Sequence, residues 1–183
     1  MFFYPSPLGN LWLMSTGAGL EKIFWQPPLE ECCVEEGEID KRACDWLEDY
    51  FNKRFRPIDF PLHPIGTPFQ QRVWQQLVQI PVGDIFTYGA LAAQLFTSAR
   101  AVGQALGKNP LPIVIPCHRV VAADGVGGFS AFGGRQTKVV LLAHEGLNIM
   151  PCGQKKIKGQ TLGDESKKKG GGNWGAVLRP PRS

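Results

Sequence analysis

The sequence predicts a mixed α/β (α+β) fold, with short strands in the first part of the chain and mostly helices in the second. Two observations support this class. Apolar residues alternate between turn signals over the first 25 residues, whereas later segments repeat apolar residues with a helical period behind capping residues. Prolines at 57, 61 and 64 separate the two patterns. We therefore expect an α/β domain with its linker over 1–66, a helical domain over 67–150 and a tail over 151–183.

The N-terminal part begins with a predicted hairpin. FFY is followed by turn residues in PSPLGN and then by LWLMSTGAGLEKIFW, which GAG divides again. A helix is expected in ACDWLEDYFNKRF, with Trp46, Leu47, Tyr50 and Phe51 on one face and Phe55 as a further candidate. Residues 57–66 hold three prolines, so we expect a linker without regular structure there.

The clearest helix start is at Thr67. This residue is a good N-cap, Pro68 suits the first helical position, and Gln70 completes a capping box. Pro81 ends the helix, which we place over 67–80. Its apolar stripe consists of Phe69, Val73, Trp74 and Leu77.

Two short helices follow, with only Thr97 and Ser98 between them. Thr87 caps the first, over 88–96, and Ser98 caps the second, over 99–108. The expected buried residues are Leu91, Ala92, Leu95 and Phe96 in the first helix and Val102, Ala105 and Leu106 in the second. The pair resembles a helix-turn-helix, although any hairpin of packed helices gives the same pattern.

The second of these helices carries a sparse polar stripe. Arg100, Gln104 and Lys108 recur every four residues. Between them the helix has small side chains that protrude little, at Ala99, Ala101, Gly103 and Gly107. A thin helix with a cationic stripe can approach a phosphate backbone or enter a narrow groove. Tight packing against another helix selects the same small residues, so both readings stay open.

Charge and composition restrict the partners. The net charge is +4, but residues 1–66 carry −5 and residues 67–183 carry +9, of which +6 lies from Pro151 onward. A basic half predicts a polyanionic partner, and a solvated basic tail explains the same numbers. The Lys- and Gly-rich composition of residues 151–183 predicts disorder.

No apolar run approaches the ~20 residues of a membrane span, and the N-terminus does not resemble a signal peptide. We therefore expect no membrane partner.

Five cysteines without a CxxC spacing fit a reducing compartment, the cytoplasm or a nucleus. Cys32, Cys33, Cys44 and His63 are poor candidates for zinc, because adjacent cysteines and these spacings do not suit a tetrahedral site. No metal or other cofactor is expected.

The stretch PIVIPCHRVV, residues 112 to 121, places a cysteine beside a histidine at the end of an apolar run. We expect Ile113–Ile115 to form a buried strand that Pro116 ends, so that His118 reaches the thiol of Cys117 through a bent backbone or a bridging water. A histidine base needs an acid to orient it. Asp84, Asp124 and Glu145 are available, and Glu145 is favoured because it closes an apolar helix. A buried core thiol beside a satisfied histidine is the alternative.

A glycine-rich loop and one last helix complete the helical domain. DGVGGFSAFGG lacks the spacing of a nucleotide-binding fingerprint and is typical of a loop that closes around a small ligand. The last helix, about 136–145, packs Val139, Leu141 and Leu142 and ends before Gly146.

Three segments together resemble one family. NPLPIVIPCHRVVAADG, with GTPFQQRVWQQL upstream and TKVVLLAHEGL downstream, is similar to the O6-alkylguanine-DNA alkyltransferases, or methylated-DNA–protein-cysteine methyltransferases. The likeness covers 67–147 and extends more loosely to the N-terminal hairpin. It implies a ribonuclease-H-like first domain and a winged-helix-like helix-turn-helix domain that binds double-stranded DNA in the minor groove as a monomer. It also implies that O6-alkylguanine, chiefly O6-methylguanine, is flipped out of the duplex and repaired once by irreversible alkyl transfer.

The resemblance implies a role for each matching residue. Cys117 would accept the alkyl group, His118 would be its base through a water, and Glu145 would complete the relay. Asn109 would brace the turn. In the substrate pocket, Tyr88 would rotate the nucleotide and donate to the base, and the Val120 carbonyl would read the guanine amino group. Backbone amides near Ser130 would face O6. Either Phe129 or Phe132 would cover the alkyl group.

On the DNA surface, Arg100 would fill the space that the flipped base leaves. The other expected DNA contacts are Ala99, Ala101, Gly103, Gln104, Lys108 and Arg119. The turn LFTS is shorter, and the loop GGFSAFGG longer, than in many relatives. Three rival functions remain: a non-catalytic protein that binds alkylated DNA, a helix-turn-helix regulator, and a hydrolase with a Cys-His-Glu triad.

Overall fold

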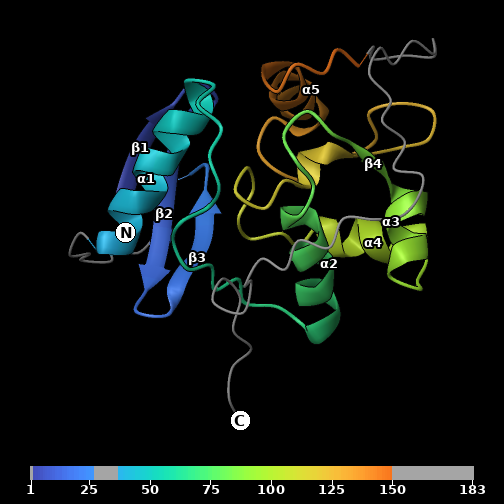
Figure 1. Ribbon diagram of the computed structural model, residues 1–183, viewed down its shortest axis with the longest axis horizontal. Helices are drawn as coiled ribbons and strands as arrows, with labels where there is room; N and C mark the ends of the chain where they lie inside the picture. The colour runs from blue at the N-terminus through green and yellow to red at the C-terminus, as the bar shows by residue number, and fades with distance from the viewer. Residues whose placement is uncertain (1, 27–36, 150–183) are drawn as a thin grey trace.

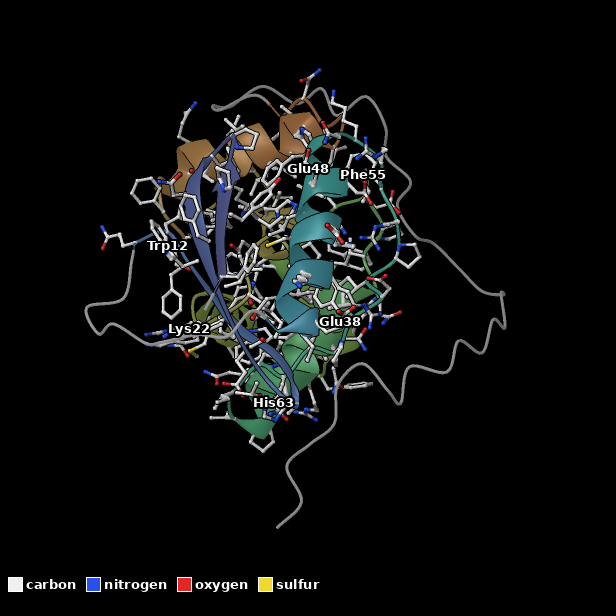
Figure 2. All side chains as sticks on the ribbon, turned by 90° about the vertical axis from the view of Figure 1, so that its left-hand side faces the viewer. Trp12, Lys22, Glu38, Glu48, Phe55 and His63 are labelled. Atoms are coloured by element: carbon white, nitrogen blue, oxygen red, sulfur yellow. The ribbon has the colours of Figure 1, made fainter. Side chains whose placement is uncertain are left out.

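The protein consists of a sheet-and-helix layer beside a group of helices, as a computed structural model describes for residues 2–26 and 37–149 (Figure 1). The first layer contains β1 (Phe2–Ser6), β2 (Gly9–Thr16) and β3 (Gly19–Phe24), antiparallel and in that order. Helix α1 (Glu38–Phe51) packs against all three strands, and Figure 2 labels Glu38 and Glu48 toward its two ends. The expected tail, Cys32 and Cys33 lie outside the described residues.

The outer edge of β3 is covered by segments from later in the chain. Leu20 forms a parallel bridge with Leu62, through hydrogen bonds of 2.9 Å to the Pro61 carbonyl and 2.8 Å from the His63 amide. Residues 57–66 contain no helix or strand, as expected of a linker, and this single bridge forms because the open strand edge provides hydrogen-bond partners for the linker backbone. The amide of Ile23 also donates to the Pro110 carbonyl at 2.9 Å, which ties β3 to the loop that precedes Cys117.

The second layer contains the predicted helices with short strands between them. Its elements are α2 (Pro68–Val78), β4 (Phe86–Thr87), α3 (Tyr88–Gln94), α4 (Ala99–Leu106), the 3₁₀ turn η1 (Cys117–Arg119), β5 (Val120–Val121) and α5 (Gly134–His144). The capping box of Thr67 and Gln70 is present, and Thr87 and Ser98 cap α3 and α4 as predicted. β4 and β5 pair in parallel. The Trp74 indole donates to the Ala105 carbonyl at 3.0 Å and fixes α2 against α4.

The turn between α3 and α4 corrects one predicted core residue. Phe96 is 97% exposed and has φ of 53°, so it is not part of the buried face of α3. The amide of Thr97 donates to the Ala92 carbonyl and that of Phe96 to the Ala93 carbonyl, which is the Schellman pattern of a helix end. The left-handed conformation that this pattern requires directs the Phe96 side chain away from the helix pair.

The segment before Cys117 is buried as predicted, but it is not a strand. Residues 111–116 form a series of turns, Ile113 has φ of 75°, and Ile115 donates its amide to the Leu111 carbonyl at 2.8 Å. Pro110, Pro112 and Pro116 remove backbone donors that a strand would use, so the apolar run folds on itself. Cys117 then begins η1, whose bent backbone allows neighbouring side chains to diverge.

Candidate active site

Asn109 holds the turn that presents Cys117. Its amide group donates to the Ile115 carbonyl at 2.8 Å and to Sγ of Cys117 at 3.2 Å, while its Oδ1 accepts from the Leu111 amide at 3.0 Å. One side chain therefore replaces the ladder hydrogen bonds that the proline-rich turn lacks. Cys117 is 6% exposed, and the position of its thiol is set directly by this amide.

The imidazole of His118 pairs with Glu145 in the interior. Nε2 of His118 lies 2.8 Å from Oε1 of Glu145, and both side chains are fully buried. Because the ionised carboxylate can only accept hydrogen bonds, Nε2 carries the hydrogen and Nδ1 carries the lone pair. Nδ1 is buried and has no protein partner among the described residues. It is thus a buried acceptor that a small donor such as water would satisfy.

Arg119 also binds this carboxylate. Its Nε donates to Oε2 of Glu145 and its Nη2 to Oε1, both at 2.8 Å, and its Nη1 donates to the Ile80 carbonyl. The expectation that Arg119 contacts DNA is therefore wrong: the residue is 6% exposed and its guanidinium is used inside the protein. The bidentate pair anchors Glu145 for His118.

These contacts determine the charge of each group. Burial favours the neutral form of Glu145, but hydrogen bonds from His118 and Arg119 outweigh burial and lower its pKa from 4.5 to about 2. Burial lowers the pKa of His118 below its ordinary 6.5, with Glu145 opposing and Arg119 and Lys138 adding to the effect. At neutral pH the site therefore contains a carboxylate and a neutral imidazole, which is the state a base requires.

The thiol of Cys117 is protonated at neutral pH. Burial raises its pKa above 9.0, and the hydrogen bond from Asn109 and the positive charge of Lys138 act in the opposite direction. No preformed thiolate exists in this state, so the proton has to leave during a reaction rather than before it.

Two cavities meet at Cys117. One, of about 310 Å³, is lined by Tyr88, Gly103, Leu106, Gly107, Gly128 and Phe129. The other, of about 340 Å³, lies toward the end of β3 and is lined by Phe24, Trp25, Pro110, Pro112 and Phe132 among others. Both cavities are lined by Leu106, Gly107, Cys117 and Ser130. Phe129 and Phe132 thus belong to different cavities, which separates the two candidates for the residue beside the alkyl group.

Gly128, in the wall of the first cavity, is held by a residue that sequence reasoning missed. Lys138 is fully buried, and its Nζ donates to the Val120 carbonyl at 2.6 Å and to the Gly128 carbonyl at 3.0 Å. The Tyr88 hydroxyl also donates to the Gly128 carbonyl, at 3.3 Å. Burial lowers the pKa of Lys138 to about 8. Its position three and four residues before Leu141 and Leu142 places it on the buried face of α5, and that spacing was the available signal.

The outer face of α4 is open. Arg100, Gln104 and Ala99 are exposed, Lys108 is exposed just beyond the helix end, and Ala101 and Gly103 are half-buried. Gly103 of this helix and its C-cap residue Gly107 line the cavity that contains Tyr88, which places that cavity beside α4.

Metal ligands are not grouped in the described part of the chain. No set of three or more His, Cys, Asp or Glu side chains lies close enough together there to hold a metal ion. Cys44 is buried as a free thiol in α1, and His63 is 2.9 Å from Glu21. No described helix is long and apolar enough to cross a bilayer.

Known proteins share both layers of this structure. The family model for the DNA binding domain of 6-O-methylguanine DNA methyltransferase matches residues 68–147, and the model for the ribonuclease-like domain of the same family matches residues 2–64. The methylated-DNA–protein-cysteine methyltransferase of Haemophilus influenzae is 36% identical over 165 residues, which are 85% of this chain and 91% of that protein. The protein of the same name from Shigella flexneri is 48% identical over 164 residues, 79% of this chain and 94% of that one.

A solved structure agrees with these relatives. The crystal structure of Mycobacterium tuberculosis OGT in complex with DNA has a TM-score of 0.69 and 37% identity, and the match covers 78% of this chain and 90% of that one. The two family models together match most of the sequence, and the relatives are covered over nearly their whole length. The chain therefore belongs to the 6-O-methylguanine DNA methyltransferase family, whose members are named methylated-DNA–protein-cysteine methyltransferases.

Proposed function

We propose that this protein repairs DNA by transferring an alkyl group, chiefly methyl, from O6 of guanine to Sγ of its own Cys117. The observation that carries the proposal is the meeting of three features at one sulfur: the Asn109 hydrogen bond, the two cavities, and a neutral buried His118 in the next position. The names of the relatives and the DNA complex of the Mycobacterium tuberculosis protein support the substrate.

The reaction needs a proton to leave the thiol as the new bond forms. His118 accepts this proton at Nδ1 through a water, and the imidazolium is stabilised by Glu145, which Arg119 holds in place. Sulfur then forms a bond to the alkyl carbon while the carbon–oxygen bond breaks, and guanine takes up one proton on its ring. Thiol and alkylguanine are converted into thioether and guanine. Because water does not hydrolyse a thioether, each protein molecule acts once.

The lesion has to leave the duplex to reach the sulfur. Flipping a base costs a few kcal/mol, and contacts to the protein must offset that cost. The cavity beside Tyr88 receives the base. The Val120 carbonyl, which has a second lone pair besides the one that Lys138 uses, reads the amino group of the base. Backbone amides near Ser130 face O6, and Phe129, which lines the same cavity as Tyr88, borders the alkyl group. The small residues of α4 enter the minor groove, and Arg100 takes the place of the flipped base.

The remaining expectations complete the proposal. The protein acts as a monomer without a metal or other cofactor, since the thiol and the base together account for the bonds made and broken. A free buried thiol suits a reducing compartment that contains DNA, the cytoplasm or a nucleus. A lesion-binding protein that does not react would have no need of the proton path from Cys117 to Glu145.

Stoichiometry tests the proposal. The protein is mixed with a fivefold excess of duplex DNA containing one O6-methylguanine, and restored guanine is measured over time by digestion and chromatography. We expect restoration to stop at one lesion per protein chain. The Cys117→Ala variant should bind the same duplex and restore none. Continued turnover would contradict the proposal and favour a hydrolase, and binding without restoration by the wild type would favour a recognition protein.

A further inference from the structure

The phenol of Tyr50 reaches across from the N-terminal domain to the buried carboxylate of Glu145. Tyr50 lies near the end of α1, is 2% exposed, and donates from its hydroxyl to Oε1 of Glu145 at 2.8 Å. The same oxygen accepts hydrogen bonds from His118 and Arg119, each also at 2.8 Å. One carboxylate oxygen therefore receives three donors, and one of them comes from 95 residues earlier in the chain.

Several contacts keep the Tyr50 ring in this position. The Trp46 ring stacks on it with centroids 5.5 Å apart, and the His144 ring lies 5.2 Å away. Nε2 of His144 also donates to the Tyr50 carbonyl at 2.8 Å. Figure 2 labels Glu48 and Phe55 where the end of α1 meets α5, and Phe55 contacts His144 edge-on there. The hydroxyl is therefore held toward Glu145 by packing from both domains.

We propose that Tyr50 is a positioning residue for alkyl transfer, through which the N-terminal domain sets the proton affinity of His118. The inference rests on the proposed role of His118 as the base. Each donor to Oε1 takes up part of the negative charge of Glu145 and leaves less of it to stabilise an imidazolium. The Tyr50 hydroxyl thus keeps His118 neutral to lower pH than Arg119 alone would, and removing it lets His118 hold its proton more strongly.

The charged groups around the relay allow this effect to be isolated. His118 faces Glu145, Arg119 and Lys138, and Tyr50 faces Glu145, Arg119 and His144. Between about pH 5 and 7, Glu145 with its pKa of about 2 stays ionised and Lys138 with its pKa of about 8 stays charged. The contacts of His144 with Tyr50 use the backbone carbonyl and the ring, so they are preserved when only the hydroxyl is removed.

The test is the pH profile of a single-turnover reaction of the full chain with duplex DNA containing O6-methylguanine. In Tyr50→Phe, we expect the acid limb of the pH–rate profile to move to higher pH. The rate should fall about fivefold at the acid end of the profile and less than about twofold at pH 8. Tyr4→Phe is the matched control, because the Tyr4 hydroxyl donates to Oε2 of Glu48 at 2.9 Å in the same domain but outside the relay. It should leave the acid limb in place.

A second measurement does not depend on the stability of the variant. Wild-type protein made with 3-fluorotyrosine has a more acidic and stronger donor at position 50, so its acid limb should move to lower pH. The same labelling of Tyr50→Phe should have no such effect. An unshifted limb, or a uniform loss of rate at all pH values, would overturn the inference alone. A wild-type protein that transfers no methyl group would overturn the proposed function as well.

Discussion

The Asn109 amide donates to Sγ of Cys117 at 3.2 Å while the same nitrogen donates to the Ile115 carbonyl at 2.8 Å. A single side chain thus shapes the turn and stabilises negative charge on the sulfur. Replacing it with alanine removes the hydrogen bond that favours thiolate and leaves the buried Leu111 amide without this acceptor, at a cost of about 1–3 kcal/mol. The Ile115 carbonyl still accepts from the Cys117 amide at 2.8 Å.

For Asn109→Ala we expect slower methyl transfer by at least about tenfold and a higher thiol pKa, since the lost hydrogen bond lowers that pKa in the wild type. The rate of Cys117 alkylation by iodoacetamide as a function of pH measures the thiol pKa directly. Asn148→Ala, which changes an exposed amide, is the control. An unchanged pH profile in Asn109→Ala would contradict the assigned role.

Lys138→Met should also raise the thiol pKa, because the lysine provides the positive charge that favours thiolate. The change additionally removes the hydrogen bonds from Lys138 to the Val120 and Gly128 carbonyls, of which the second keeps the Tyr88 hydroxyl as a donor. We expect about a tenfold slower reaction of Cys117 with iodoacetamide at pH 7.5 and a larger loss of DNA repair. Lys53→Met alters an exposed lysine and should change neither. Equal reactivity of the Cys117 thiol in the two variants would contradict the role of Lys138 in lowering the thiol pKa.

Arg100→Ala should weaken repair of duplex DNA far more than reaction with the free base O6-methylguanine. The free base enters the cavity without flipping, so the residue that fills the vacated space has nothing to contribute. We expect a loss of more than about tenfold on the duplex and less than about twofold on the free base. Arg72→Ala, on α2, is the matched control. A similar loss on both substrates would exclude a role in flipping.

Stability should fall in acid for a reason that can be traced to Glu145. Its pKa in the folded protein is about 2, below its ordinary 4.5. Its contribution to the free energy of unfolding is therefore present above pH 4.5 and is lost as the pH falls toward 2. His118, with a lowered pKa, adds a loss in the same direction below pH 6.5. Urea unfolding between pH 7 and 3 should show a steeper decline for wild type than for Glu145→Gln. Glu48→Gln should keep the wild-type slope, and equal slopes in all three proteins would contradict the assignment.

Local signals in the sequence predicted most of the helical layer. Thr67, Thr87 and Ser98 each cap a helix as expected, because capping depends on residues within one turn. The apolar run at 113–115 misled the prediction, since burial alone does not distinguish a strand from a buried turn. The segment turns because prolines at 110, 112 and 116 remove strand donors and because the Asn109 side chain binds the backbone of both Leu111 and Ile115.

The residues of the site that sequence reasoning missed depend on contacts between distant segments. Tyr50 was expected on the apolar face of its helix, and it lies there, but its hydroxyl meets Glu145 only because the two domains pack together. Arg119 was expected on the DNA surface, whereas its partner Glu145 lies far along the chain in the interior. The pairing of His118 with Glu145, by contrast, was inferred from the scarcity of acids in this half of the sequence.

The most direct test of the account is the mass of the intact protein after incubation with duplex DNA containing O6-methylguanine, followed by peptide mapping. We predict the addition of one methyl group per chain, located on Cys117, with no other cysteine modified and no further repair when lesions are in excess. An unchanged mass despite lesion binding, or a methyl group on any other residue, would contradict the central claim that Cys117 is the acceptor.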